Sequence, residues 1–200
     1  ETRNKSKQAF DLAKHLYEEI IAEGPKGKYY SHALWEIGYV YREQGMVQDA
    51  REAFERYLTT FPKDDNRRRA YAWYLFDLKK YEEAMAQCLK CVNEYTGRWE
   101  IAEMYRRRKM MEDCIGTLEA MIPNHKEKAA EIYWRIAWVY RTFHKWKEAK
   151  ETYELIIGKY PQKTDDSYWE LARMHHHNMG KFKEAIKYYD MSNKEPSSLF

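Results

Sequence analysis

The sequence predicts an all-α protein built from five consecutive helix pairs that follow one unpaired helix. A small residue followed four positions later by a larger apolar one recurs along the chain, with the small residue at Ala50, Ala84, Cys114, Ala149 and Ala185. These positions lie 34, 30, 35 and 36 residues apart, a period typical of repeated helical units. With only 8 glycines and 5 prolines in 200 residues, the chain also lacks the residues that a turn-rich β fold needs.

Each repeat is expected to contain two helices. In the second helix an apolar residue precedes the small one by three positions, as Val47 precedes Ala50, which gives the stripe of an amphipathic helix. Another small residue lies twelve positions upstream in four repeats and thirteen upstream in the fifth, at Gly38, Ala72, Ala102, Ala137 and Ala172. Antiparallel helices approach closely where both carry small residues, so we expect contacts such as Gly38 against Ala50.

The elements follow in order along a single domain, residues 1–200. The unpaired helix covers about residues 4–23, because residues 13–21 match 149–157, the second helix of the fourth repeat. The repeats cover about residues 30–62, 65–95, 96–124, 127–161 and 165–196. Each proline follows the last helix of a unit, where a residue without an amide hydrogen ends a helix. The prolines are Pro25, Pro62, Pro123, Pro161 and Pro196.

These repeats resemble the tetratricopeptide repeat (TPR) family, in particular TPR proteins of the bacterial type. The family's series of large, small, aromatic and proline residues at fixed offsets is reproduced by Leu34, Ile37, Gly38, Tyr41, Ala50, Phe54 and Pro62. The fourth and fifth repeats carry similar series from Tyr133 and from Tyr168, and the resemblance covers about residues 30–195. The departures are Cys114 in place of alanine and one extra residue between His175 and Gly180. The resemblance implies a TPR superhelix, an α-solenoid.

In this family the first helices line a concave surface, whose floor is formed by positions 5, 9 and 12 of each repeat. We number the repeats from Ser31, Asp65, Tyr95, Ala130 and Asp165. The resulting fifteen positions hold eight aromatic residues and five arginines, although the chain is only 16% aromatic, and they include six of the seven tryptophans. The candidate ligand-binding groove comprises Trp35, Tyr39, Arg42, Arg69, Trp73, Trp99, Arg106, Trp134, Trp138, Arg141, Trp169 and Arg173.

Two interpretations of this groove stay open. Its rings either stack between neighbouring helices beneath arginine side chains and stiffen the superhelix, or bind a ligand as a hot spot of tryptophan and arginine. The leading hypothesis is a scaffold or adaptor that holds an extended or helical partner segment. Polysaccharide (glycan) binding on the same rings is the alternative. Single-stranded RNA is a third, which the small net charge of +3 disfavours.

Catalytic and metal-binding motifs are absent from the sequence. It has no nucleophile elbow, zinc-protease motif or glycine-rich phosphate loop, so we expect no enzyme and no cofactor. Cys88 and Cys91 occupy inward helix positions, and His175, His176 and His177 point about 100° apart on a helix, so neither group predicts a metal site. A mean hydropathy of −0.92 and the lack of a long apolar run predict no membrane span.

The ends of the chain carry apolar residues that its own helices do not obviously cover. Phe10 and Tyr17 would need a preceding helix, and residue 1 is Glu rather than Met, so we expect the chain to be excised from a longer protein. Phe182 and Tyr189 are the corresponding apolar residues near the other end. Together with Phe10 and Tyr17 they predict self-association through the terminal helices or a need for flanking helices. Cysteines at buried positions favour the cytoplasm, while the periplasm stays open if a signal peptide has been removed.

Overall fold

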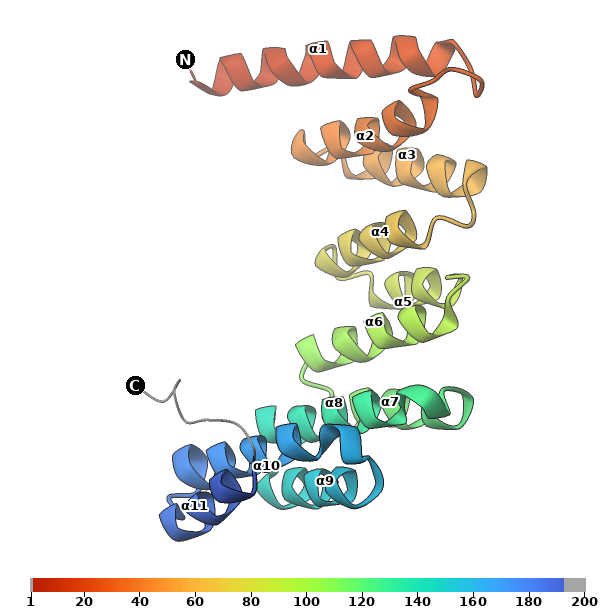
Figure 1. Ribbon diagram of the computed structural model, residues 1–200. Coiled ribbons are helices and arrows are strands. Elements are labelled where there is room, and N and C mark those ends of the chain that lie inside the picture. The colour runs from red at the N-terminus through yellow and green to blue at the C-terminus, as the bar shows by residue number, and fades with distance from the viewer. Residues whose placement is uncertain (1, 193–200) are drawn as a thin grey trace. The chain divides into compact units, whose positions relative to one another are not determined.

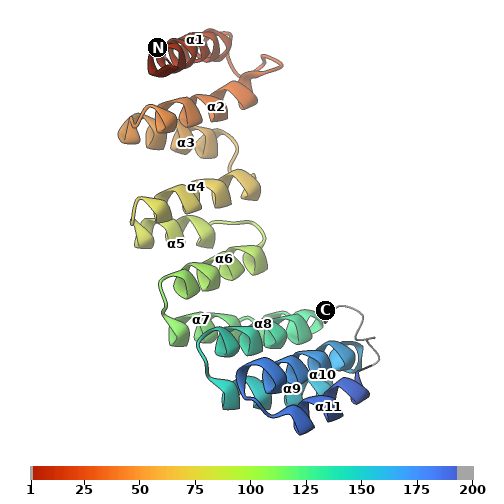
Figure 2. The same cartoon turned by 90° about the vertical axis from the view of Figure 1, so that its left-hand side faces the viewer.

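The computed structural model describes residues 2–192, and every regular element within that range is helical. One helix, α1, comes first, and the helices α2 to α11 form five pairs, each joined by a short turn (Figures 1 and 2). The predicted all-α fold of five helix pairs after one unpaired helix is therefore confirmed. No helix in the described range combines the length and the apolar composition that crossing a membrane requires.

The chain divides into two compact units, residues 1–93 and 94–200. In the first unit α1 packs against α2, and α3 contacts α4. Its helices are α1 (Thr2–Ala22), α2 (Tyr30–Glu43), α3 (Val47–Thr60), α4 (Asp65–Asp77) and α5 (Tyr81–Leu89). Pro25 and Pro62 follow α1 and α3, as expected for residues that end a helix.

The second unit stacks three helix pairs, with α7 against α8 and α9 against α10. Its helices are α6 (Glu94–Arg107), α7 (Met111–Glu119), α8 (Ala129–Thr142), α9 (Trp146–Lys159), α10 (Thr164–Arg173) and α11 (Phe182–Met191), with a π-helix at Met174–Asn178. Pro123 and Pro161 lie in short 3₁₀ turns after α7 and α9. Pro196 lies outside the described residues.

Every pair turns through one residue with left-handed backbone. These residues are Gly45, Lys79, Lys109, His144 and Gly180, with φ of 73°, 61°, 60°, 59° and 63°. In four repeats this residue is position 15, and in the fifth it is position 16. The structure accommodates the extra residue as the π-helix, in which the amide of Met179 donates to the carbonyl of Met174 at 3.2 Å.

The core of the first unit is aromatic, and Gly38 lies against the ring of Phe54, while the expected contact of Gly38 with Ala50 stays a prediction. A Cβ atom added to Gly38 would lie 2.5 Å from Cε1 of Phe54, so it is the Phe54 ring that fills the space above this glycine. Trp35 packs on the same ring with a centroid distance of 4.6 Å. The missing side chain at position 38 therefore makes room for the Phe54 ring.

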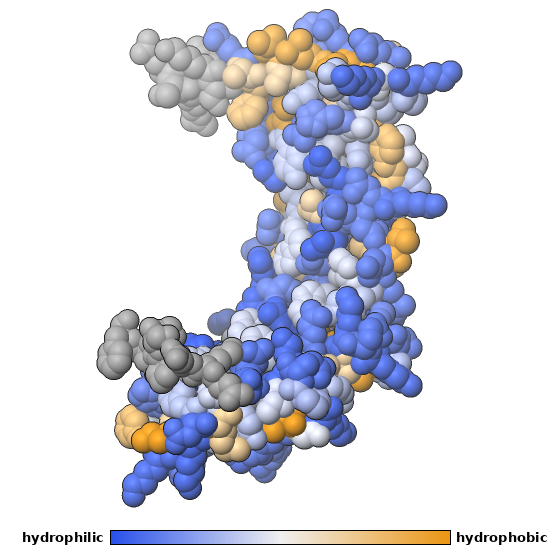
Figure 3. Space-filling view, in the orientation of Figure 1, coloured by the Kyte–Doolittle hydropathy of each residue, from blue (hydrophilic) through white to orange (hydrophobic). Residues whose placement is uncertain are grey.

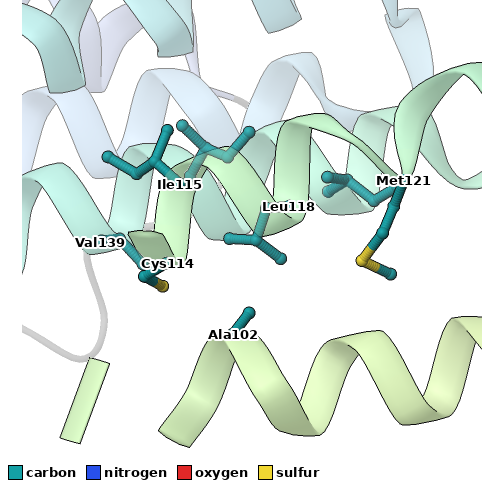
Figure 4. Close-up of a cluster of buried hydrophobic side chains, with 8 residues drawn as sticks. Ala102, Cys114, Ile115, Leu118, Met121 and Val139 are labelled. Atoms are coloured by element: carbon teal, nitrogen blue, oxygen red, sulfur yellow. The ribbon is translucent and has the colours of Figure 1, made fainter. Parts of the chain in front are cut away.

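One core cluster of the second unit lies between α6, α7 and α8, and another lies between α8, α9 and α10. Cys114 and Leu118 of α7, and Met121 just after it, point toward α6, from which Ala102 points back (Figure 4). Ile132, Ile136 and Val139 of α8 complete this cluster. Burial raises the pKa of the Cys114 thiol to about 11, so the thiol remains protonated and packs as a small apolar group.

The exposed apolar residues near the two ends differ from those expected. On α1 the exposed side chains are Leu12 and Leu16, at 60% and 48%, whereas Phe10 and Tyr17 are half-buried. On α11, Phe182 is 61% exposed as expected, but Tyr189 is half-buried. Figure 3 shows apolar surface over α1 and near α11 amid mostly hydrophilic atoms. Self-association through these helices stays a prediction.

Candidate functional site

The first helices of the three repeats in the second unit carry the densest set of aromatic and charged side chains. Position 5, 9 and 12 residues lie on one stripe of each helix because they are spaced i, i+4 and i+7. Ion pairs and cation–π contacts join α6 to α8 and α8 to α10. They are made by these side chains and by Arg135 and Glu170, which follow position 5 in the sequence. We name this surface the tryptophan–arginine face, and it comprises Trp99, Glu103, Arg106, Arg135, Trp138, Arg141, Glu170 and Arg173.

Glu103 of α6 is the centre of the first charge cluster on this face. Its carboxylate lies 2.5 Å from Nη2 of Arg106 on the same helix and 2.5 Å from Nη2 of Arg135 on α8, and Arg107 approaches it to 3.3 Å. Burial alone would raise the pKa of Glu103, but hydrogen bonds from Arg106 and the two nearby positive charges outweigh it and leave that pKa lowered. Glu103 is therefore ionised at neutral pH and orients the arginines around it.

The same arginines cover the indole rings. The guanidinium carbon of Arg135 lies 4.2 Å from the ring centre of Trp138 and 5.5 Å from that of Trp99. Arg106 lies 5.1 Å from the ring centre of Trp138. These distances are within the range of cation–π interactions, so the rings hold the guanidinium groups against the face.

A second charge cluster links α8 to α10. The carboxylate of Glu170 forms an ion pair with Arg141 of α8 and another, at 3.3 Å, with Arg173 on its own helix. Glu170 is only 13% exposed, whereas Arg173 is 46% exposed. One carboxylate thus serves two arginines here, whereas Glu103 contacts three in the first cluster, and the outer arginine reaches solvent.

Trp134 and Trp169 are more closely tied to the protein interior than the sequence predicted. Trp134 packs against the core between α8, α9 and α10, and its Nε1 is buried without a hydrogen-bond partner in the described residues. The Trp169 ring meets Tyr189 of α11 edge-on at a centroid distance of 5.1 Å. Both residues are half-buried and flank the tryptophan–arginine face.

In the first unit the expected groove residues behave in two ways. Trp35 is only 1% exposed and packs on Phe54, so its assignment to a ligand-binding groove is wrong: it is a core residue. Arg42 is exposed and covers the half-buried Tyr39 ring at 4.6 Å. Arg69 and Trp73 of α4 are both half-buried.

Three residues of the tryptophan–arginine face are absent from the predicted groove: Glu103, at position 9, and Arg135 and Glu170. Arg135 and Glu170 both occupy position 6, next to Trp134 and Trp169, whereas the family pattern directs attention to positions 5, 9 and 12. Each pairs with a charged residue on the preceding repeat's first helix. The sequence did carry a signal for these pairs: a charge at position 6 of one repeat is opposite in sign to a charge at position 9 or 12 of the preceding repeat.

The cysteines and histidines do not assemble into a metal site within residues 2–192. Cys88, Cys91 and Cys114 are buried, and none of them forms a disulfide within the described residues. His175 is 4% exposed inside the π-helix, and its ring lies 5.2 Å from that of Tyr188. Both cysteines of the Cys-x-x-Cys pair therefore contribute to packing, as their inward positions predicted.

Comparison with known families and structures agrees with this architecture. Two family models described as tetratricopeptide repeat match the chain, one at residues 32–64 and 131–163, the other at 165–190. Among curated proteins, none matches the chain. The matched residues coincide with the first, fourth and fifth helix pairs.

Three solved structures illustrate the shared fold. A tetratricopeptide repeat protein from Parabacteroides merdae is 16% identical, with a TM-score of 0.52, over 93% of this chain and 73% of that one. PilW, a type IV pilus biogenesis factor, is 15% identical, with a TM-score of 0.51, over 95% and 87%. MamA from Desulfovibrio magneticus is 14% identical, with a TM-score of 0.50, over 80% and 92%. Repeat period, helix pairs and family matches agree, and the chain belongs to the tetratricopeptide repeat family.

Proposed function

We propose that this chain is a protein-interaction module that holds a carboxylate-bearing partner segment on the tryptophan–arginine face. The family generally acts through protein–protein interactions, which supports a binding role over an enzymatic one. The observation that carries the proposal is that Arg106 and Arg135 lie against the Trp138 ring. A ligand that approaches this ring meets guanidinium groups first.

The charge of the face favours an acidic segment. Four arginines, at positions 106, 135, 141 and 173, share the two carboxylates Glu103 and Glu170. Each guanidinium has five N–H donors in a planar fork that matches a carboxylate, and the internal ion pairs use only part of them. A positive surplus therefore remains on the face, and it would attract and orient Asp or Glu side chains of a partner.

The same geometry is less suited to glycans and to RNA. Sugar rings and bases bind by stacking on open aromatic faces. The arginines lie against Trp138 and Trp99, and Trp134 packs on the core. An arginine that is already stacked on a ring loses less side-chain conformational entropy on binding than an arginine that extends into solvent. This favours recognition of the partner by the guanidinium groups themselves.

Selection from a random peptide library tests this proposal directly. We expect a displayed library of twelve-residue peptides, panned against the purified chain, to yield binders with at least two Asp or Glu residues. Panning in parallel against Arg106→Gln/Arg135→Gln should lose those binders. A matched control is Arg98→Gln, because Arg98 also lies on α6 but pairs with Glu94, at 2.7 Å, and is not part of the tryptophan–arginine face.

Two results would overturn the proposal. Binders without any acidic residue would contradict the charge argument. Acidic binders that the Arg106→Gln/Arg135→Gln variant retains, at a folded fraction equal to that of the wild type, would show that they bind elsewhere.

A further inference from the structure

A cavity of about 340 Å³ lies beside the outer end of the tryptophan–arginine face, where the turn between α8 and α9 meets the π-helix. Its walls are formed by Arg141, His144, Trp146, Arg173, His177 and Asn178, together with Thr142. Every one of these side chains carries an N–H or O–H donor or can do so, and none is a carboxylate. Such a lining is suited to an anion with several oxygen atoms.

The π-helix supplies one wall of this cavity. The fifth repeat has one residue more than the others before its left-handed turn residue, and this residue is absorbed within Met174–Asn178. The wider turn of the π-helix takes up this residue without ending the helix. His177 and Asn178 of this segment line the cavity together with His144 and Trp146 of the preceding pair.

The charge around the cavity is positive. Arg141 and Arg173 share the single carboxylate of Glu170, which leaves one positive charge unbalanced. The Thr142 hydroxyl donates to the carbonyl of Trp138 at 2.9 Å, so it is already engaged. His144 and Trp146 contact each other edge-on, with ring centroids 5.2 Å apart, which holds the imidazole and indole at one side of the cavity.

From this arrangement we infer that the cavity binds a phosphate monoester, the phosphorylated side chain of a partner segment. A phosphate monoester carries close to two negative charges and three terminal oxygens, whereas a carboxylate carries one charge and two oxygens. Two guanidinium groups, an indole and an amide match the larger number of acceptors. The volume, about ten times the ~30 Å³ that one water molecule occupies in the liquid, admits the phosphate with the stem of its side chain.

This inference rests on the proposed function for the partner, because Arg141 and Arg173 belong to the tryptophan–arginine face. It adds a chemical requirement at one end of that face. Arg106 and Arg135 would bind ordinary carboxylates, while the cavity would select a phosphorylated residue in the same segment.

The test uses small probes, so its result does not depend on any peptide. We expect N-acetyl-O-phosphoserine amide to shift the indole N–H signal of Trp146 in a saturable way in ¹H–¹⁵N spectra, with the signal assigned by Trp146→Phe. Arg173→Gln should weaken this binding at least tenfold, and His177→Gln, at an exposed position, should weaken it measurably. Arg98→Gln should leave it unchanged.

Four outcomes would overturn the inference. A shift without saturation, or one that Arg173→Gln leaves unaltered, would show that the cavity is not the site. Equal affinity for N-acetyl-aspartate amide would show that it does not select phosphate. Equal affinity for inorganic phosphate would assign the cavity to the free anion instead of a phosphorylated side chain. The titration with the phosphoserine probe and the selection of acidic peptides are independent experiments. A negative result in either one therefore does not change how the other is interpreted.

Discussion

The guanidinium carbon of Arg135 lies 4.2 Å from the ring centre of Trp138, three residues further along α8. The same guanidinium reaches Glu103 of α6 at 2.5 Å, so one side chain links an indole ring on its own helix to a carboxylate on another. The side chains of Arg135 and Glu103 are 24% and 15% exposed. Ion pairs shielded in this way are coupled more strongly than exposed ones.

We expect this pair to show a measurable coupling energy. Replacing Glu103 by Gln removes the charge that orients the arginines, and replacing Arg135 by Gln removes one of its partners. In a double-mutant cycle followed by urea unfolding, the two changes should interact by about 1 kcal/mol. Strictly additive losses would show that the contact contributes nothing to stability.

Gly38 should be intolerant of a methyl group. Its added Cβ would lie 2.5 Å from a ring atom of Phe54, which is 1% exposed and wedged between Trp35 and Tyr71 at centroid distances of 4.6 and 5.6 Å. Gly38→Ala should therefore lower the free energy of unfolding by roughly 1–3 kcal/mol, as overpacking does.

Gly116 provides the matched control for this substitution. It lies within α7, and an added Cβ there would have no neighbour within 4 Å. Gly116→Ala should raise the free energy of unfolding by roughly 0.5–1 kcal/mol, because alanine is the better helix former. Equal effects of the two substitutions in thermal or urea unfolding would contradict the packing described around Phe54.

Lys109 occupies the left-handed turn position between α6 and α7, with φ of 60°. A Cβ atom is strained in that conformation, and Gly45 and Gly180 fill the same place in two other turns. Lys109→Gly should stabilise the protein by about 0.5–1 kcal/mol after the entropy that glycine adds to the unfolded chain is deducted. Lys109→Ala keeps the Cβ, so a comparable gain from alanine would contradict the strain argument.

His175 should make stability depend on pH. It is 4% exposed, and within the described residues neither ring nitrogen has a hydrogen-bond partner. Burial lowers its pKa below the usual 6.5, with Lys181 and Lys150 acting in the same direction against Glu184 and Glu154. The unfolded chain then binds a proton at this residue more readily than the folded one. The free energy of unfolding should therefore fall as pH is lowered from about 7.5 through 6.5.

Urea unfolding across that pH range checks the prediction. His175→Gln removes the titrating group and should flatten the dependence, whatever its effect on absolute stability. His32→Gln is the control, because the His32 side chain is 59% exposed. An unchanged slope in His175→Gln would assign the pH dependence to other groups.

The repeated helix pairs were predictable because their spacing and their small residues are local features of the sequence. The extra residue of the fifth repeat was also visible as a spacing of thirteen, but its absorption in a π-helix was not. Trp35 was misassigned because burial at position 5 depends on neighbours such as Phe54, whose contact the family pattern does not specify. Arg135 and Glu170 were missed because their partners lie on other helices, about 30 residues away in sequence.

In the proposed function, arginines held against tryptophan rings bind an acidic partner segment. Calorimetric titration of one selected acidic peptide into the wild type, Arg106→Gln/Arg135→Gln and Arg98→Gln, each corrected for its folded fraction, tests this most directly. We predict that the double substitution weakens binding by about 2 kcal/mol or more, as loss of hot-spot arginines does, while Arg98→Gln binds like the wild type. Equal affinity of all three folded proteins for the peptide would contradict the claim.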